Sequence, residues 1–381
     1  MQNKTEAFVT FYSKNNISPV SQDISDLSKH FHRRESLFRS LGILPILVQG
    51  SSIIEFGPGS GHNAVYTASL RPNKYYLVDG NPLGVKQTQE RLSSFKFSNF
   101  QVFNSLFLDY FTEEAFDIVW AEGCIPHQSD PSLILKHLSR FSKESGIFVC
   151  TTSNAISYLS ETIRRLIFDI CFSQNSPSLE QGLNILRPLL SPHLLNLIGM
   201  SRPIDDWIID NILQPLQDRK LCSIPDVIAV LGEDYDFYAS SPKFIIDWRW
   251  YKEIVGSQRD FNKVALDCYY RTNLNLIDYR YVFDTHSVEF GKEIEESCSK
   301  SWELMCQIQR GDSSKWQAMF DLMSNISSLI QQTAPQTAKA IIEASEWLQD
   351  GVATERELQY FPQWWGRGQQ YLSLIRRNST L

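Results

Sequence analysis

The sequence predicts an α/β protein, with a doubly wound, mostly parallel sheet and large helical additions before, within and after it. Three observations lead to this fold class. Short apolar runs alternate with helical stretches from about residue 50, a glycine cluster follows the first run, and helical spacing replaces the alternation after about residue 155. Strands that alternate with helices at this pace form parallel sheets covered on both faces.

Five short apolar runs, each bounded by turn residues, predict the parallel strands. They comprise residues 52–56, 75–78, 100–103, 116–120 and 147–151. The first run ends in the cluster Gly57-Pro58-Gly59-Ser60-Gly61, and residues 63–70 after it are typical of a helix. The second run closes on Asp79-Gly80, where Asn81 and Pro82 predict the start of the next helix. A βαβ unit is therefore complete by about residue 80.

Apolar residues at helical spacing predict the additions to this sheet. Residues 26–41 predict an N-terminal helix, and residues 156–225 predict a helical insertion. Residues 227–231 fit either a strand or a helix, and residues 235–238 predict an antiparallel strand that returns to the sheet.

The C-terminal third is helical by the same criterion. Residues 316–330 and 338–348 each carry an apolar stripe, and Gly351 ends the second helix. The spacing of Thr354 and Glu357 is that of a capping box, which predicts a last short helix.

The composition argues against several classes of protein. Of the 381 residues, 43% are hydrophobic and 21% are charged, which is typical of a globular protein and not of a disordered one. The apolar run at residues 41–48 is far shorter than the roughly 20 residues of a membrane-spanning helix. The N-terminus has no apolar segment behind a basic start. We therefore expect a cytoplasmic protein with no membrane partner.

Charge and cysteine content narrow the partners further. The net charge is −7 and the Lys and Arg residues are dispersed, so we expect no nucleic-acid partner. The seven cysteines show no CxxC pair and no zinc-site spacing, so we expect reduced thiols and no metal. A small-molecule partner is favoured, and homo-oligomerisation remains possible.

The glycine cluster is the segment that predicts chemistry. Glycines between a strand and a helix allow a ligand to lie against the backbone, near amides that favour an anionic group. A nucleotide-type cofactor is therefore expected. Gly59, Gly61 and Ala64 also satisfy G-x-G-x-x-A, with Asp79 about 20 residues further on, as in dinucleotide-binding proteins. The pattern alone leaves both kinds of cofactor open.

Residues Glu55 to Gly61 resemble motif I of the class I S-adenosylmethionine-dependent methyltransferases, in which an acid is followed by G-x-G-x-G. Asp79 after the second strand and residues 116–119 in the fourth add to this resemblance, which covers about residues 50–155. It implies a Rossmann-like core whose last strand is antiparallel. It also implies S-adenosylmethionine as the cofactor and methyl transfer as the reaction.

The resemblance also implies roles for the residues of the loop. Gly57, Gly59 and Gly61 would line the methionine moiety, and Glu55 would anchor the loop and reach the methionine ammonium group. Asp79, which precedes Gly80, would accept hydrogen bonds from both ribose hydroxyls. A carboxylate suits this task because its two oxygens match the spacing of a vicinal diol.

Four further residues complete the candidate site implied by the resemblance. Ser105 occupies the position at which the family usually has an acid that faces the adenine amino group, so this sequence departs from the pattern there. Leu106 would pack on the adenine, and Glu122 would border the methionine end. His127 is the candidate catalytic base, although an amine or thiolate acceptor needs no base and His127 would then only orient it.

These expectations divide the chain into five parts. They are an N-terminal helical cap (1–48), the cofactor-binding core (49–155), a helical insertion or lid (156–225), returning strands (226–254) and a C-terminal helical region (255–381). The expected function is methyl transfer to a small or medium-sized acceptor enclosed by the helical additions. The alternatives are an NAD(P)-dependent oxidoreductase and a non-catalytic interaction module. The aromatic cluster 247–251 fits either core packing or a cover over the acceptor pocket, and the cluster 364–367 has the same ambiguity.

Overall fold

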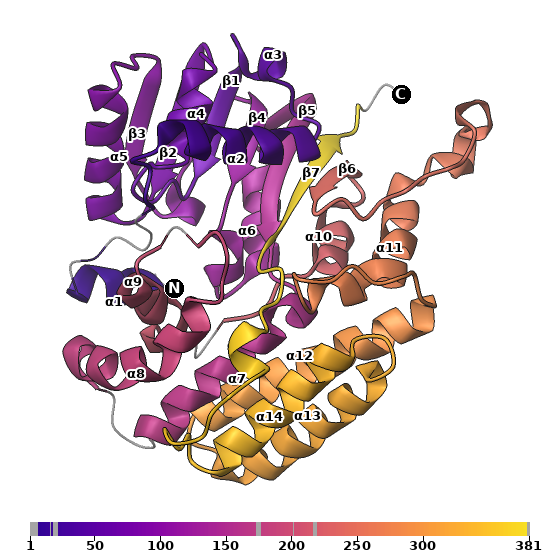
Figure 1. Cartoon of the computed structure of the whole chain (residues 1–381). Helices are drawn as coiled ribbons and strands as arrows, with labels where there is room; N and C mark the ends of the chain where they lie inside the picture. The colour runs from indigo at the N-terminus through magenta and orange to yellow at the C-terminus, as the bar shows by residue number, and fades with distance from the viewer. Residues whose placement is uncertain are drawn as a thin grey trace. The chain divides into compact units, whose positions relative to one another are not determined.

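The computed structural model describes residues 7–15, 17, 22–172, 177–200, 202–215 and 219–378 (Figure 1). The chain forms two compact units. Unit 1 comprises Met1–Ser153, Asp218–Tyr269 and Gln369–Leu381, and unit 2 comprises Asn154–Gln217 and Tyr270–Gly368.

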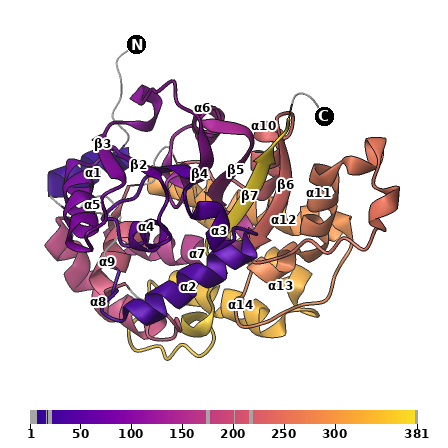
Figure 2. The same cartoon turned by 90° about the horizontal axis from the view of Figure 1, so that it is seen from above.

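Unit 1 contains, within its described residues, a seven-stranded sheet in the order β3-β2-β1-β4-β5-β7-β6 (Figures 1 and 2). The strands are β1 (Ser52–Phe56), β2 (Lys74–Asp79), β3 (Phe100–Asn104), β4 (Phe116–Ala121), β5 (Ser142–Thr152), β6 (Tyr235–Ser241) and β7 (Gln370–Arg376). Strands β1 to β5 pair in parallel, and β7 is antiparallel to both β5 and β6. The predicted fold class is therefore confirmed, including the antiparallel last strand.

Strand β7 is the main element of this sheet that the sequence did not predict. It lies within residues 255–381, which were expected to be helical, and its residues pair with Ile147–Thr152 of β5 on one side and Tyr235–Ser241 of β6 on the other. Leu372 and Leu374 of β7 are fully buried. Strand β7 thus joins β6 to the parallel strands of the sheet.

The predicted start of the helix after β2 is confirmed. Asn81 accepts a hydrogen bond from the Leu83 amide at the start of α5, and Asp130 accepts one from the Leu133 amide at the start of α6. The other helices of unit 1 lie around the same sheet. The helices of this unit are α1 (Ala7–Asn15), α2 (Leu27–Ser40), α3 (Pro45–Val48), α4 (Ala64–Ser69), α5 (Pro82–Ser94), α6 (Pro131–Ser139), α10 (Ile224–Leu231) and, continuing into unit 2, α11 (Phe261–Thr272).

The segment expected to supply returning strands, residues 226–254, contains β6 but begins in a helix. Residues Ile224–Leu231 form α10, whose N-terminus is a capping box between Ser223 and Asp226. This capping box decides the ambiguity of residues 227–231 in favour of the helix.

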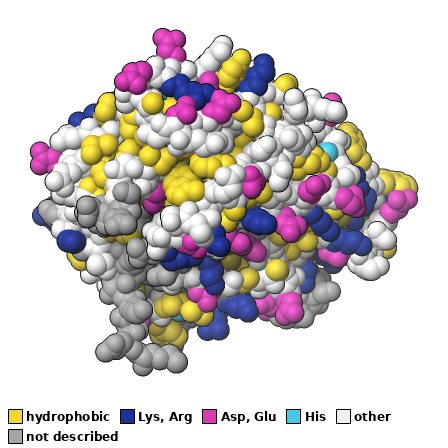
Figure 3. Space-filling view, turned by 90° about the horizontal axis from the view of Figure 1, so that it is seen from below, with side chains coloured by type: hydrophobic (Ala, Val, Ile, Leu, Met, Phe, Trp, Pro, Cys, Tyr) yellow, Lys and Arg dark blue, Asp and Glu magenta, His cyan; other side chains and the backbone are white. Residues whose placement is uncertain are grey.

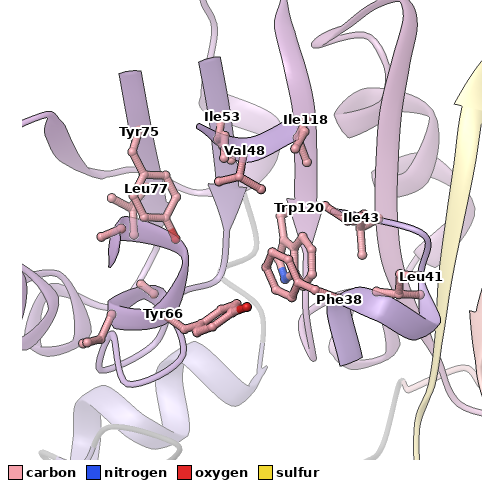
Figure 4. Packing of buried hydrophobic residues seen from close by; sticks show 14 of the residues in the cluster. Phe38, Leu41, Ile43, Val48, Ile53, Tyr66, Tyr75, Leu77, Ile118 and Trp120 are labelled. Atoms are coloured by element: carbon pink, nitrogen blue, oxygen red, sulfur yellow. The ribbon is translucent and has the colours of Figure 1, made fainter. Parts of the chain in front are cut away.

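A hydrophobic core joins α2 to one face of the sheet (Figure 4). Phe38 of α2 stacks on Trp120 of β4 with ring centroids 4.7 Å apart, and Tyr66 of α4 meets Phe38 edge to face at 5.0 Å. Burial of such aromatic surface is a major favourable term in folding. Helix α2 is therefore held as part of the sheet's own core.

Unit 2 is helical in its described residues. Its helices are α7 (Ala155–Phe172), α8 (Leu179–Leu194), α9 (Ile204–Ile208), α12 (Val288–Gln309), α13 (Trp316–Ile330) and α14 (Pro335–Gln349). The helical insertion and the two predicted C-terminal helices are thus present. The predicted last short helix at Thr354–Glu357 is wrong, because residues 353–360 form turns and bends.

The aromatic cluster 364–367 belongs to the core of unit 2. Trp364 is fully buried and Trp365 is 1% exposed. The Trp364 indole donates to the Ile277 carbonyl at 2.7 Å, and the buried Arg164 guanidinium lies 3.6 Å from the Trp365 ring centroid. These contacts assign the cluster to packing.

No helix among the described residues combines the length and the apolar composition that crossing a membrane requires. On the face shown in Figure 3, Lys and Arg side chains lie among Asp and Glu side chains. The expectation that the chain binds no nucleic acid stays a prediction.

Candidate functional site

Three neighbouring strands of unit 1 bring the predicted site residues to one edge of the sheet. Strand β1 lies between β2 and β4, and all three run in parallel, with Phe56 in register with Val78 and Ala121. The segments that follow these strands therefore meet at their carboxyl ends, where ligands bind in open α/β sheets. This grouping was predicted from the resemblance of Glu55–Gly61 to motif I and from the positions of Asp79 and Glu122 after their strands.

The glycine loop adopts a backbone that requires glycine. Gly57 and Gly61 have φ angles of 75° and 77°, and a Cβ on them would lie 2.7 Å from the Cys124 Cβ and 2.9 Å from the Thr88 Cα respectively. Gly59 also has a positive φ, 57°, but no described atom lies within 4 Å of a Cβ built there. The middle glycine is therefore the position at which a ligand can approach the backbone.

Helix α5 and β2 hold this loop in place. The Thr88 hydroxyl donates to the Gly59 carbonyl at 2.9 Å, and Arg91 Nε donates to the Ser60 carbonyl at 2.8 Å. The Gly59 amide donates to Asp79 Oδ2 at 2.9 Å. The loop is thus preorganised, with the open side of Gly59 fixed beside the end of β2.

Asp79 is a buried carboxylate that binds two backbone amides. Its Oδ2 accepts from Gly59, and its Oδ1 accepts from the Asn81 amide at 2.8 Å. Burial raises the pKa of Asp79 to about 6, although both amide hydrogen bonds act in the opposite direction. A carboxylate offers roughly four acceptor positions, so two remain for a diol such as ribose. The sequence did not predict that Asp79 also fastens the loop.

Glu55 lies at the carboxyl end of β1 and is 4% exposed. The Tyr75 hydroxyl of β2 donates a hydrogen bond to it. Burial raises the pKa of Glu55 to about 7, and the charges of Glu122 and Asp79 add to this shift. Glu55 therefore lies at the start of the loop as predicted, but its described partner is Tyr75.

Glu122 follows β4 and accepts five hydrogen bonds from protein groups. Arg34 binds both of its oxygens at 2.8 Å, and the Asn63 amide, the Trp120 indole and the Tyr371 hydroxyl donate at 3.0, 3.0 and 2.9 Å. Burial by itself raises the pKa of Glu122, but Arg34 and the other donors outweigh burial and hold the pKa below its usual value. The carboxylate is thus ionised and saturated, which favours a structural role over a cofactor contact.

Sequence reasoning missed the partners of Glu122. Arg34 is on α2, Asn63 follows the glycine loop, and Tyr371 is on β7. The pattern of α2 showed that Arg34 lies on a helix, but nothing local indicated its partner. The contact of Tyr371 with Glu122 could not be predicted, because β7 itself was not predicted.

Ser105 and Leu106 lie beside the end of β2. The Ser105 amide donates to the Asp79 carbonyl at 3.1 Å, and its hydroxyl donates to the Leu106 carbonyl at 2.9 Å. A Cβ built on Gly80 would lie 3.0 Å from Leu106 Cδ2. Leu106 therefore packs against Gly80, and the Ser105 oxygen can still accept a hydrogen bond.

His127 ends the 3₁₀ turn η2 (Ile125–His127), and its side chain lies outside the described part of the chain. Its role as a base stays a prediction. Cys124 precedes this turn, and burial raises the pKa of its thiol far above the usual range. The Cys124 thiol donates to the Phe56 carbonyl at 3.3 Å, so it packs at the loop as a neutral group. No group of three or more potential metal ligands occurs among the described His, Cys, Asp and Glu residues.

Residues 29–203 match a family model described as a methyltransferase domain. No curated protein matches the sequence.

Solved structures resemble parts of the chain. The N-methyltransferase NodS from Bradyrhizobium japonicum WM9, in complex with S-adenosyl-L-homocysteine, is 16% identical, with a TM-score of 0.32 over 39% of this chain and 74% of that one. Magnesium protoporphyrin IX methyltransferase from Synechocystis PCC 6803, with bound S-adenosylmethionine, is 12% identical, with a TM-score of 0.32 over 40% and 79%. PKMT2 from Rickettsia typhi is 15% identical, with a TM-score of 0.42 over 61% and 48%.

Proposed function

We propose that the chain transfers a methyl group from S-adenosylmethionine, since residues 29–203 match the family model of a methyltransferase domain. The observation that carries this proposal is the geometry at Gly59. Its backbone is open to a ligand on one side, and its amide is bonded to Asp79 on the other. A cofactor with a ribose beside a charged amino-acid moiety matches this pairing of open backbone and carboxylate.

The described residues fit this cofactor. Gly59 leaves the space that a side chain would fill, while Gly57 and Gly61 give the loop its curvature. We assign binding of the ribose to Asp79 and binding of the methionine ammonium group to Glu55. A nearby cation stabilises the carboxylate form of Glu55. Leu106 would pack on the adenine.

The remaining site residues have supporting roles in the proposal. Gly80 makes room for Leu106, and the Ser105 hydroxyl can accept a hydrogen bond from the adenine amino group. Glu122 borders the site from the end of β4, and we assign it to fixing α2 through Arg34. This structural role replaces the cofactor contact that the sequence analysis predicted for Glu122.

The bound cofactor would supply an electrophilic methyl group on a sulfonium. Displacement at such a centre needs alignment of the acceptor more than acid or base chemistry. We propose that the acceptor is a small or medium-sized molecule and that His127 accepts its proton, or orients it where no proton must be lost. Enclosure of the acceptor by the helical additions stays a prediction from the sequence.

Cofactor binding tests the proposal against its first rival. We expect isothermal titration calorimetry to detect S-adenosylmethionine and S-adenosylhomocysteine but neither NAD nor NADP. Asp79→Ala removes charge-assisted hydrogen bonds, so it should weaken the affinity by about tenfold or more. Glu90→Ala, an exposed change on α5, is the control and should retain the wild-type affinity.

The opposite result would identify the rival. Binding of NAD or NADP without S-adenosylmethionine would assign Gly59, Gly61 and Ala64 to a dinucleotide and reject the methyltransferase. The comparisons give that oxidoreductase no support. An unchanged affinity in Asp79→Ala would remove Asp79 from the site.

A further inference from the structure

The segment of unit 1 that joins β6 to α11 exposes large apolar side chains. We call five of them the aromatic tip: Ile246, Trp248, Trp250, Tyr251 and Val255, which are 67, 92, 56, 72 and 66% exposed. Figures 1 and 2 show this segment running outward from β6, through the short turns η4 (Tyr251–Glu253) and η5 (Gly256–Arg259), before it returns into α11.

The fold of unit 1 gives no packing reason for these side chains. The cluster 247–251 fitted core packing in the sequence, but Trp248 is almost fully exposed. Single exposed apolar residues are ordinary, whereas several adjacent ones mark a surface that binds something. The aromatic tip is therefore a candidate interaction surface.

Ion pairs and ring contacts shape the aromatic tip. Arg249 binds Asp247 through Nη2 at 2.6 Å, and its Nη1 donates to the Gln258 carbonyl at 2.5 Å. The bond to Gln258 links two parts of the segment that are nine residues apart. Lys252 Nζ lies 5.2 Å from the Trp250 ring centroid and 6.0 Å from that of Tyr251. The rings are thus presented with a cation beside them.

The charge of this segment differs in sign from that of the chain. Between β6 and α11, residues 242–260 contain four basic residues against three acidic ones. The basic residues are Lys243, Arg249, Lys252 and Arg259, and the acidic ones are Asp247, Glu253 and Asp260. The whole chain instead has 36 Lys and Arg against 43 Asp and Glu. The local excess of positive charge favours an anionic partner surface.

We propose that the aromatic tip docks on the surface of a membrane that contains anionic lipid. Trp and Tyr rings are enriched at the boundary between lipid and water, where their apolar body and polar edge are both accommodated. Lys side chains extend from such positions toward the headgroups. Burial of apolar rings and attraction to anionic headgroups add to each other in binding of this kind.

A second protein surface suits the aromatic tip less well. A standard protein interface buries roughly 800 Å² on each partner. Five partly exposed side chains of this size offer on the order of 600 Å². The tip is also an outward turn, so a protein would need a matching hollow, whereas a lipid surface adapts its shape. This docking departs from the expectation that the chain has no membrane partner.

Vesicle co-sedimentation of the full chain tests the proposal. We expect binding to vesicles of phosphatidylcholine with phosphatidylserine, weaker binding to phosphatidylcholine alone, and loss of the difference at high salt. The triple variant Trp248→Ala, Trp250→Ala and Tyr251→Ala should lower the partition coefficient by about tenfold or more. The matched control is Leu195→Ala, Ile198→Ala and Val282→Ala, which removes three side chains that are 79, 85 and 87% exposed elsewhere and should bind as the wild type does.

A milder variant locates the contact. Lipids with brominated tails should quench the fluorescence of the bound wild type, and Trp248→Phe should reduce this quenching while preserving an aromatic side chain. Absence of binding to both kinds of vesicle would overturn the proposal, as would equal losses in the control triple variant. Self-association that light scattering detects in the wild type but not in the tip variant, without vesicle binding, would instead assign the tip to a second copy of the chain.

Discussion

Glu55 shows how burial changes the chemistry of a carboxyl group in the candidate site. Its side chain is buried, and burial raises its pKa to about 7, with further contributions from the charges of Glu122 and Asp79. The hydrogen bond from Tyr75 and the charge of Arg34 act in the opposite direction. Near neutral pH both protonation states of Glu55 are therefore populated, and a bound cation would select the carboxylate.

This raised pKa predicts a stability change with pH. The folded chain binds the Glu55 proton more tightly than the unfolded chain does, so the free energy of unfolding should fall as pH rises from about 4.5 to about 7. Asp79, whose pKa is raised to about 6, contributes in the same direction. Glu55→Gln should remove its share of this fall, on the order of 3 kcal/mol.

Urea unfolding at about pH 5 and about pH 8 measures this change. Glu90→Gln, whose side chain is 65% exposed in the wild type, should retain the wild-type dependence. A wild-type profile in Glu55→Gln would contradict the raised pKa of Glu55.

Glu122 shows what a local sequence pattern can and cannot predict about a side chain. Its place after β4 followed from the strand pattern, and the structure puts it at the expected edge. Its partners Arg34, Asn63 and Tyr371 are remote in sequence, and the hydrogen bonds they form occupy its oxygens. The residue type suggested a ligand contact, but the tertiary contacts favour a structural one.

Helix α2 depends on this pair as well as on its apolar face. The Arg34 and Glu122 side chains are 7 and 11% exposed, and the Arg34 guanidinium also lies 5.6 Å from the Trp120 ring centroid. A buried ion pair requires both members, since removal of one leaves the other charge unpaired.

Truncation of Arg34 should therefore lower the stability of the folded chain. We expect Arg34→Ala to lower the free energy of unfolding by about 3 to 5 kcal/mol, because it leaves a buried carboxylate without its cation. The double change Arg34→Met with Glu122→Gln should lower the free energy of unfolding less than Arg34→Ala does. Chemical denaturation measures both, and Lys86→Ala, from a pair whose side chains are largely exposed, should change stability by less than about 0.5 kcal/mol. A loss in Arg34→Ala no larger than this control would show that the pair contributes little.

Strand β7 could not be predicted because its environment is nonlocal. The run Gln370–Arg376 mixes polar and apolar residues, and its strand partners precede it by more than a hundred residues. Helix α5 was easier, since Asn81 and Pro82 signal its start locally. The parallel strands β1 to β5 were therefore predictable from sequence. Of the two strands that pair in an antiparallel way at the other end of the sheet, β6 was predicted and β7 was not.

The pairing of β7 with a strand on each side predicts a large effect for a small change. Leu374 belongs to β7, which lies between β5 and β6, and its side chain is fully buried. Leu374→Ala should therefore lower the free energy of unfolding by about 2 to 5 kcal/mol through the cavity it leaves. Val282→Ala removes atoms from a side chain that is 87% exposed and should be nearly neutral. Equal stabilities of the two variants, measured by urea unfolding, would contradict the place of β7 in the core.

Across the whole chain, the candidate site was more predictable than the fold around it. Parallel strands end at one edge, so the strand pattern together with the resemblance to motif I was sufficient to group Glu55, Gly59, Asp79 and Glu122. Only the structure identifies Gly59 as the glycine that is open to a ligand. Gly57 and Gly61 also have positive φ angles, but other side chains pack against them. The exposure of the cluster 247–251 could not be predicted either, because its residue pattern fits core packing equally well.

This difference between the glycines predicts where a ligand should protect the chain from hydrogen exchange. Saturating S-adenosylhomocysteine should slow exchange in peptides that contain Gly59–Gly61, Asp79–Asn81 and Ser105–Leu106, since binding restricts the opening of these segments. Strand β7 is already paired on both sides, so its exchange should change little. Hydrogen–deuterium exchange with mass spectrometry maps both regions in one experiment. Protection confined to other segments, with the glycine loop unchanged, would place the cofactor elsewhere in the chain.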